Sequence, residues 1–121
     1  MMTIKYDYKT IQEKWIRIWK KEKTCHVDLA TAKKPFYNLM MFPYPSAEGL
    51  HIGNVYAYIG SDIQGRFIKA KGYDVFQPMG FDAFGIHAEN YAIKQNKNPR
   101  DIIPRNIAHF TSQLKTIGAM F

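Results

Sequence analysis

The stretch Phe36–Pro78, FYNLMMFPYPSAEGLHIGNVYAYIGSDIQGRFIKAKGYDVFQP, decides the fold. It opens with Phe36–Phe42, a short, almost wholly apolar run between prolines, which predicts a buried strand rather than a helix. Val55–Lys71 has apolar residues at helical spacing and is followed by Gly72, which predicts a helix with a glycine just past its end. Tyr73–Gln77 predicts a second short strand. Strand, helix and strand in this order predict a parallel, right-handed βαβ unit.

The central helix carries two kinds of pattern. One face is apolar and is predicted to pack; its members are Val55, Ile59, Ile63 and Phe67. Gly60 and Gly65 lie inside the helix, where each costs about 1 kcal/mol relative to alanine. We expect a close approach of the helix to a neighbouring strand to offset that cost.

A second helix is predicted before this unit. Residues 8–23 are amphipathic, Asp7 is placed to cap their N-terminus, and we expect the Trp15 and Trp19 face to dock on the rest of the fold. Residues 24–35 form a connector. The sequence is therefore divided into 1–35, a leading helix and connector, and 36–121, the βαβ core with its following helices.

After the second strand, the sequence predicts a loop at 79–85, a short helix at 86–95 and a turn-rich segment at 96–103. Pro104 is predicted to begin a last helix, which Gly118 ends. The apolar face of this helix is predicted to be Ile107, Phe110, Leu114 and Ile117. Two parallel strands are too few for a stable buried sheet. The fold class is therefore α/β, as the N-terminal half of a doubly wound parallel-sheet domain.

Composition narrows the class of protein. The 121 residues are 46% hydrophobic, which suits one folded domain. Cys25 is the only cysteine, which excludes a disulfide framework and a four-cysteine zinc site; no protein-bound metal is expected. No signal peptide or membrane span is recognisable, so a soluble, cytoplasmic protein with no membrane partner is expected. A net charge of +7 suits a polyanionic partner or simple solubility, and charge alone does not choose between them.

Three clusters lie where ligands bind in open α/β sheets, beyond the carboxyl ends of the strands. Gly49–Asn54 precedes the central helix, whose N-terminus favours phosphate, although a loop histidine there is more often structural. Met41–Pro45 forms an aromatic rim that suits an apolar side chain or is a packed strand end. Gly80–Gly85 holds Asp82, which could bind a substrate ammonium or form a turn.

Together these blocks resemble a known family. They are Phe42-Pro43-Tyr44-Pro45-Ser46, Gly49-Leu50-His51-Ile52-Gly53, Gln77-Pro78-Met79-Gly80-Phe81-Asp82-Ala83-Phe84-Gly85 and Ala88-Glu89. In this order they resemble a class I aminoacyl-tRNA synthetase and, within that class, are most similar to leucyl-tRNA synthetase. The resemblance runs from about Tyr6 to Gly118. It implies a Rossmann-like nucleotidyltransferase domain that joins leucine to ATP, with Mg²⁺ accompanying the ATP, and transfers the leucyl group to tRNA(Leu).

The resemblance also implies roles for individual residues. His51 and Gly53 match the first and third places of the family's His-Ile-Gly-His motif, which binds ATP, and Asn54 takes the fourth. His51 and Asn54 are accordingly the expected catalytic pair. Asp82 matches the acidic residue that holds the leucine ammonium. Residues that match the lining of the leucine and adenylate pocket are Met41, Phe42 and Tyr44.

Three departures limit what the resemblance implies. Asn54 stands where the family has a second histidine, and an amide adds no positive charge. His87 stands where many members have proline, close enough to Asp82 in sequence to touch the pocket. The Lys-Met-Ser-Lys-Ser motif is not found. We therefore expect weak or no activity from this chain alone. We also expect poor solubility, self-association, or a complementary synthetase subunit that supplies the rest of the sheet.

Two alternatives are left open by the sequence. One is a small nucleotidyltransferase of the same superfamily, against which the Phe42–Tyr44 and Asp82 blocks speak. The other is a non-catalytic paralogue that binds an adenylate, RNA or a partner protein.

Overall fold

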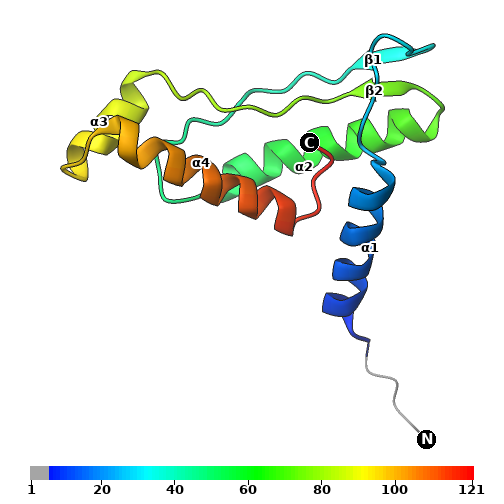
Figure 1. Cartoon of the computed structure of the whole chain (residues 1–121), viewed down its shortest axis with the longest axis horizontal. Helices are drawn as coiled ribbons and strands as arrows, with labels where there is room; N and C mark the ends of the chain where they lie inside the picture. Colours follow the sequence, from blue (N-terminus) through cyan, green and yellow to red (C-terminus); the bar gives the residue numbers. More distant parts are fainter. Residues whose placement is uncertain (1–5) are drawn as a thin grey trace, which may run out of the picture.

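A computed structural model describes residues 6–121 and has the predicted order of elements (Figure 1). The elements are α1 (Tyr8–Glu22), β1 (Pro35–Tyr37), α2 (Ile52–Ala70), β2 (Asp74–Phe76), α3 (Ile86–Lys94) and α4 (Pro99–Thr116). β1 and β2 pair in parallel, with Phe36 opposite Val75, and α2 crosses between them. The predicted α/β class with a parallel βαβ unit is confirmed.

Both strands are shorter than predicted, and β1 is buried on one face alone. The ladder holds three residues of each strand, and Asn38 extends it with one bond, from its N–H to the Phe76 carbonyl at 2.9 Å. The Asn38 side chain is buried, and its amide is satisfied there by donating to the Ser61 carbonyl of α2 at 2.8 Å. Alternate side chains point the other way, where no described element covers them; Tyr37, Leu39 and Met41 are 57%, 69% and 85% exposed. The prediction of a fully buried strand is therefore wrong.

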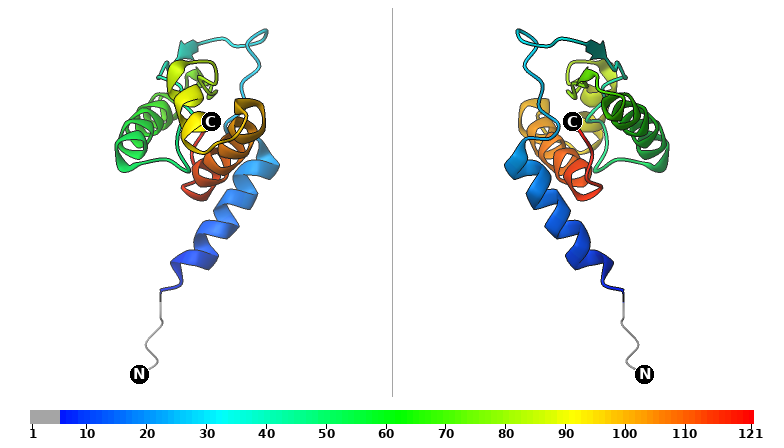
Figure 2. Two further views of the ribbon diagram at one scale, coloured as in Figure 1. Left: turned by 90° about the vertical axis from the view of Figure 1, so that its left-hand side faces the viewer. Right: turned by 90° about the vertical axis from the view of Figure 1, so that its right-hand side faces the viewer.

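The core lies between the sheet, α2 and α4, which are on the same side of the strands, and continues where α3 packs on α4 (Figures 1 and 2). Its buried apolar side chains are Tyr58, Val75, Ala88, Ala92, Ile102, Phe110, Leu114 and Met120. Gly65 of α2 meets the sheet so closely that a Cβ there would lie 2.1 Å from Gln77 Oε1. The expected close approach is confirmed at Gly65. At Gly60 it is wrong, because a Cβ there would meet nothing within 4 Å.

The predicted packing face of α2 is also wrong. Ile59, Ile63 and Phe67 are 42%, 62% and 54% exposed. The helix instead buries Tyr58 and Gly65, on the opposite side. The tight Gly65 contact with the sheet fixes this orientation, and it turns the apolar row outward.

α4 begins at Pro99 and not at Pro104, so most of the predicted turn-rich segment is helical. Asn98 caps it, accepting a bond from the Arg100 N–H at 2.9 Å, and proline fits the first helical position because it has no N–H to satisfy. The buried row is Ile102, Asn106, Phe110 and Leu114. Of the predicted face, Ile107 is only half-buried and Ile117 is 43% exposed.

α1 has the predicted Asp7 cap, which accepts a bond from the Thr10 N–H at 3.2 Å, but none of its residues is buried. The helix extends away from the rest of the molecule (Figure 2). Only its Trp19 end is held, with the Arg66 guanidinium 4.9 Å from the ring centroid. Trp15 is 46% exposed, so the expected docking face is only partly used. Within residues 6–121, no helix has the length and apolar character to cross a membrane.

Candidate functional site

The turn before α2 is built around His51 and Asn54. His51 is the N-cap residue; its Nδ1 accepts a bond from the Asn54 N–H, and Asn54 Oδ1 accepts one from the His51 N–H, both at 3.3 Å. Asn54 thus contributes to the cap from the third helical position. An imidazole whose Nδ1 accepts carries its proton on Nε2 when neutral. The exposed ring therefore presents an N–H donor at the positive end of the helix dipole.

Gly53 leaves room for this histidine. A Cβ at position 53 would lie 3.0 Å from both Nδ1 and Cε1 of the His51 ring. With any other residue here, the exposed imidazole would have to move by a few tenths of an ångström. The glycine is thus explained by the ring, before any ligand is considered.

α4 holds the loop that leads into this turn. Gln113 Oε1 accepts a bond from the Leu50 N–H at 2.8 Å, and the buried Asn106 donates to the Pro45 carbonyl at 2.9 Å. At Gly49, a Cβ would be 2.9 Å from Gln113 Nε2. Sequence reasoning missed the supporting roles of Asn106 and Gln113. One signal was available, since Asn106 is a polar residue within the buried row of α4.

The loops that follow the two strands meet. The Asp82 N–H donates to the Pro43 carbonyl at 3.0 Å. A Cβ at Gly80 would lie 2.7 Å from Cε2 of Phe42, so that glycine admits the phenyl ring. The fold therefore brings the Asp82 loop onto the aromatic rim that the sequence predicts.

His87 also belongs to this group. Its ring lies 5.1 Å from that of Tyr44, centroid to centroid, at an angle of 48°. Met41 is 85% exposed, and no hydrogen bond or aromatic contact among residues 6–121 joins it to the other predicted site residues. Nor does any hydrogen bond within that range link the His51 turn to the Asp82 loop. Apart from Met41, the predicted residues thus form two groups, one at the His51 turn and one around Tyr44, Asp82 and His87.

Tyr58, one helical turn after Asn54, lies below the His51 turn. Burial raises the pKa of the Tyr58 phenol, and a hydrogen bond with Asn54 offsets part of that effect. The phenol below the turn therefore stays protonated at physiological pH. In the described part of the chain, no three histidine, cysteine or acidic side chains come together as metal ligands.

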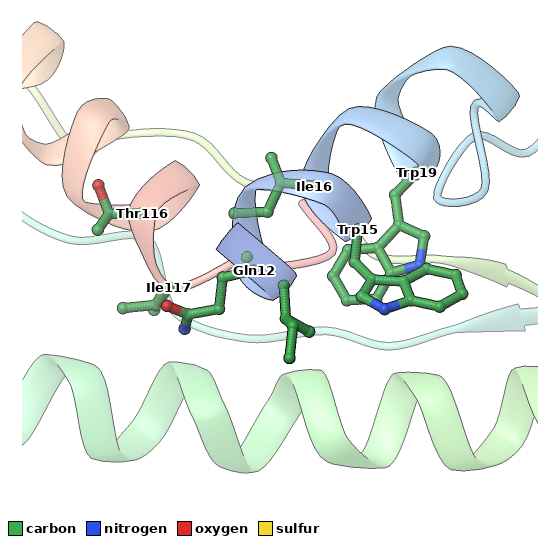
Figure 3. A pocket seen from close by; sticks show the side chains of 8 residues that line it. Gln12, Trp15, Ile16, Trp19, Thr116 and Ile117 are labelled. Atoms are coloured by element: carbon green, nitrogen blue, oxygen red, sulfur yellow. The ribbon is translucent and has the colours of Figure 1, made fainter. Parts of the chain in front are cut away.

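The candidate site is an open surface, with His51, Tyr44, Asp82 and His87 all exposed. Two hollows lie elsewhere, beside α1. One, of about 430 Å³, runs between Ile11, Trp15 and Trp19 and the end of α4 (Figure 3). The other, of about 690 Å³, lies on the Lys20 side of the same helix. Neither contains a residue of the candidate site.

Comparison with known proteins gives consistent matches. Residues 37–121 match the family described as tRNA synthetases class I (M). The chain is 47% identical to a leucine–tRNA ligase of Mycoplasma genitalium over 93% of its length, and 44% identical to one of Chlamydia muridarum over 95%. It spans about 14% of the length of each of these relatives.

A solved structure shares the fold. It is a LeuRS of Agrobacterium radiobacter in a ternary complex with tRNA and LeuAMS. The likeness covers 97% of this chain and 15% of the other, with a TM-score of 0.91 and 34% identity.

Proposed function

Because the chain belongs to the class I aminoacyl-tRNA synthetases, among the leucine–tRNA ligases, we propose that it forms the ATP- and leucine-binding part of such an enzyme. The observation that carries the proposal is the bond from the Asp82 N–H to the Pro43 carbonyl, 3.0 Å long. It joins the loops after both strands into one surface beside the α2 turn. The proposed unit for this function is residues 36–121, with 1–35 as its leading helix and connector.

ATP is proposed to bind at the start of α2. Free N–H groups and the dipole at a helix N-terminus attract phosphate, and the His51 Nε2–H adds a donor. Gly53 has no side chain and so also lets a nucleotide lie close to the backbone. The proposed catalytic pair, His51 and Asn54, would act by positioning the phosphates and stabilising charge that develops on them, with no covalent step of their own. Mg²⁺ is proposed to accompany the ATP, as the family resemblance implies.

Leucine is proposed to bind at the second group. The Asp82 carboxylate would hold the ammonium group by a charge-assisted bond, and Phe42 and Tyr44 would contact the side chain or the adenylate. Met41 and His87 are proposed to complete the lining, His87 through its contact with Tyr44. The product of this step is leucyl-adenylate with release of pyrophosphate, and tRNA(Leu) is the proposed acceptor. A cytoplasmic location suits that role.

Further polypeptide, from a complementary synthetase subunit or from a longer form of this chain, is proposed to complete the domain. β1 and β2 are the only strands in the described residues, and each keeps a free edge. The outer sheet face, with Leu39 and Met41 exposed, is not covered by those residues either. Such an edge and face pair readily with further chain.

Titration with two ligands tests the site assignment. In ¹H–¹⁵N NMR spectra, ATP is expected to shift the amide signals of the His51–Asn54 turn. The substitution His51→Ala should weaken ATP binding. His26→Ala, an exposed histidine on the connector, is the matched control and should change nothing. Shifts confined to α1 would refute the nucleotide site.

Asp82→Asn tests the leucine assignment separately. It should lower the affinity for LeuAMS by about 10- to 150-fold, which corresponds to roughly 1.5–3 kcal/mol for a charge-assisted bond. The affinity for ATP should change little. Glu13→Gln on α1 controls for the loss of one negative charge. Equal losses for both ligands would mean that Asp82 only shapes its loop.

A further inference from the structure

The larger hollow beside α1, of about 690 Å³, has a basic lining. Three lysines contribute to it from two helices: Lys20 is in the last turn of α1, Lys23 is the C-cap residue of that helix, and Lys115 is in the last turn of α4. All three side chains are exposed. Of the described residues, no acidic one lines the hollow. The fold therefore gathers cations here from distant parts of the chain.

Nearby carboxylates do not neutralise these lysines. The only ion pair within residues 6–121 joins Asp62 to Arg66, so no carboxylate of that range lies within 4 Å of a lysine. Glu13 lies on the same side of α1 as Lys20, but seven residues earlier, which is about 10 Å along the helix axis. Glu22 is closer in sequence, but it does not line the hollow. The lining is therefore positively charged.

Helix dipoles account for part of this pattern, because cations stabilise the C-terminal ends of helices. The ends of α1 and α4 together contribute about one negative charge, so the three lysines leave an excess of about two positive charges. Carbonyls at these ends also have partners already. The Trp19 carbonyl accepts a bond from the Thr24 N–H at 3.1 Å, and the Gly118 carbonyl accepts one from Arg66 Nη2 at 2.7 Å. The lysines are thus left to attract an anion.

Trp19 gives the hollow an aromatic wall. Its half-buried ring is held in place, with the Arg66 guanidinium 4.9 Å from the ring centroid. Arg66 is in turn fixed by Asp62, at 2.6 Å. On another side, a Cβ at Gly118 would lie 3.5 Å from Cζ3 of the ring. A ring that is already ordered loses little conformational freedom when a planar ligand stacks on it.

Size and chemistry together select the class of ligand. Small-molecule sites have volumes of about 300–1,000 Å³, so this hollow has room for more than a bare phosphate. Lysines bind phosphate as point charges, and a basic groove with an aromatic wall is typical of sites that hold a nucleotide by its phosphate and its base.

We propose that this hollow binds a nucleoside 5′-phosphate, either a free nucleotide or the 5′ end of an RNA strand. The phosphate contacts Lys20, Lys23 and Lys115, and the base lies against Trp19. The hollow shares no residue with the ATP and leucine surfaces, so this is a second site, and the inference does not rest on the proposed function.

Cys25 allows a direct test, because it is the only cysteine and it lines the hollow. Its alkylation by iodoacetamide, a neutral reagent, is followed on the whole chain. Uridine 5′-monophosphate (UMP) should slow the alkylation, whereas uridine and inorganic phosphate at the same concentration should have much smaller effects. Amide signals of residues 20–26 and 115–121 should shift with UMP, at concentrations that give the same Kd.

Lysine variants test the phosphate contacts. Lys20→Gln combined with Lys115→Gln should lower the affinity for UMP by about tenfold, which corresponds to about 1.4 kcal/mol. Lys94→Gln is the matched control, since Lys94 is an exposed lysine in the last turn of α3 and lies outside the hollow. It should leave the affinity for UMP unchanged. An equal loss in the control would overturn the proposal.

Other outcomes would also overturn it. Uridine or inorganic phosphate that protects Cys25 as well as UMP would exclude a nucleotide, and the second result would indicate an adventitious ion only. UMP shifts confined to the His51 turn would place the ligand elsewhere. If UMP fails to protect Cys25 while ATP still shifts the His51 turn, this hollow is wrong and the proposed function stands.

Oligouridylates distinguish the two sources of the ligand. Tighter binding of a 5′-phosphorylated oligouridylate than of UMP, with loss of that binding in the 5′-hydroxyl form, would assign the site to the end of an RNA strand. Equal or weaker binding of the phosphorylated oligouridylate would assign it to a free nucleotide. Either result supports a nucleoside 5′-phosphate as the ligand.

Discussion

Gly65→Ala should destabilise the fold although alanine is the better helix former. The added methyl would begin 2.1 Å from Gln77 Oε1, 2.9 Å from Met120 Cε and 3.0 Å from Asn38 Nδ2. Gln77 cannot simply swing away, because it is buried and its Oε1 accepts a bond from Asn38 Nδ2. Either α2 moves off the sheet or this buried bond breaks.

The magnitude follows from three terms. Replacing glycine inside a helix gains about 1 kcal/mol. Overpacking costs about 1–3 kcal/mol, and a buried polar group that loses its partner costs about 1–3 kcal/mol more. The net expectation is a loss of about 1–5 kcal/mol in the free energy of unfolding, since the helix gain offsets only part of the cost.

Gly60→Ala is the matched control on the same helix. A Cβ there meets nothing within 4 Å, so the variant should be up to about 1 kcal/mol more stable than the parent. Urea unfolding followed by circular dichroism gives both values. If the two variants had equal midpoints, the contact between α2 and the sheet would not be as close as the structure has it.

Three further predictions concern the loops, the connector and the activity. Asn106→Ala removes the buried donor to the Pro45 carbonyl and should lower the free energy of unfolding in urea by about 1–3 kcal/mol. NMR amide signals around the His51 turn should be lost as well. An unchanged urea midpoint would contradict this prediction. Bonds from the Lys34 and Lys33 N–H groups lower the pKa of the Asp74 carboxyl, so its contribution to stability is present above the ordinary carboxyl pKa and is lost as pH falls through the lowered one. The urea midpoint should therefore fall less between pH 7 and a pH below about 4 in Asp74→Asn than in the parent. If the midpoints of both proteins fell by the same amount, Asp74 would not contribute to stability. Leucine-dependent pyrophosphate exchange by the chain alone should be weak or absent, because the sequence contains no Lys-Met-Ser-Lys-Ser motif to supply the other half of the ATP site; strong exchange would show that less of the domain is needed.

Sequence alone determined the order of elements and the parallel βαβ unit. Local signals were sufficient for these: the apolar run after Pro35 begins with the first strand, Gly72 takes up φ +84° just past α2, and Asp7 caps α1. The ordered blocks from Phe42 to Glu89 were also sufficient for the family. Such features depend on residues close together in the chain, and they can therefore be predicted without knowledge of the fold.

The burial of each face depends on contacts that form only in the folded chain. Apolar periodicity located an apolar side of α2, but that side is exposed, because the approach of Gly65 to Gln77 turns the helix the other way. Similarly, the contacts of Gln113 with Leu50 and of Asp82 with Pro43 join residues distant in sequence. A periodic pattern shows that a face is apolar, whereas its burial depends on what packs against it, and that is settled by contacts between distant residues.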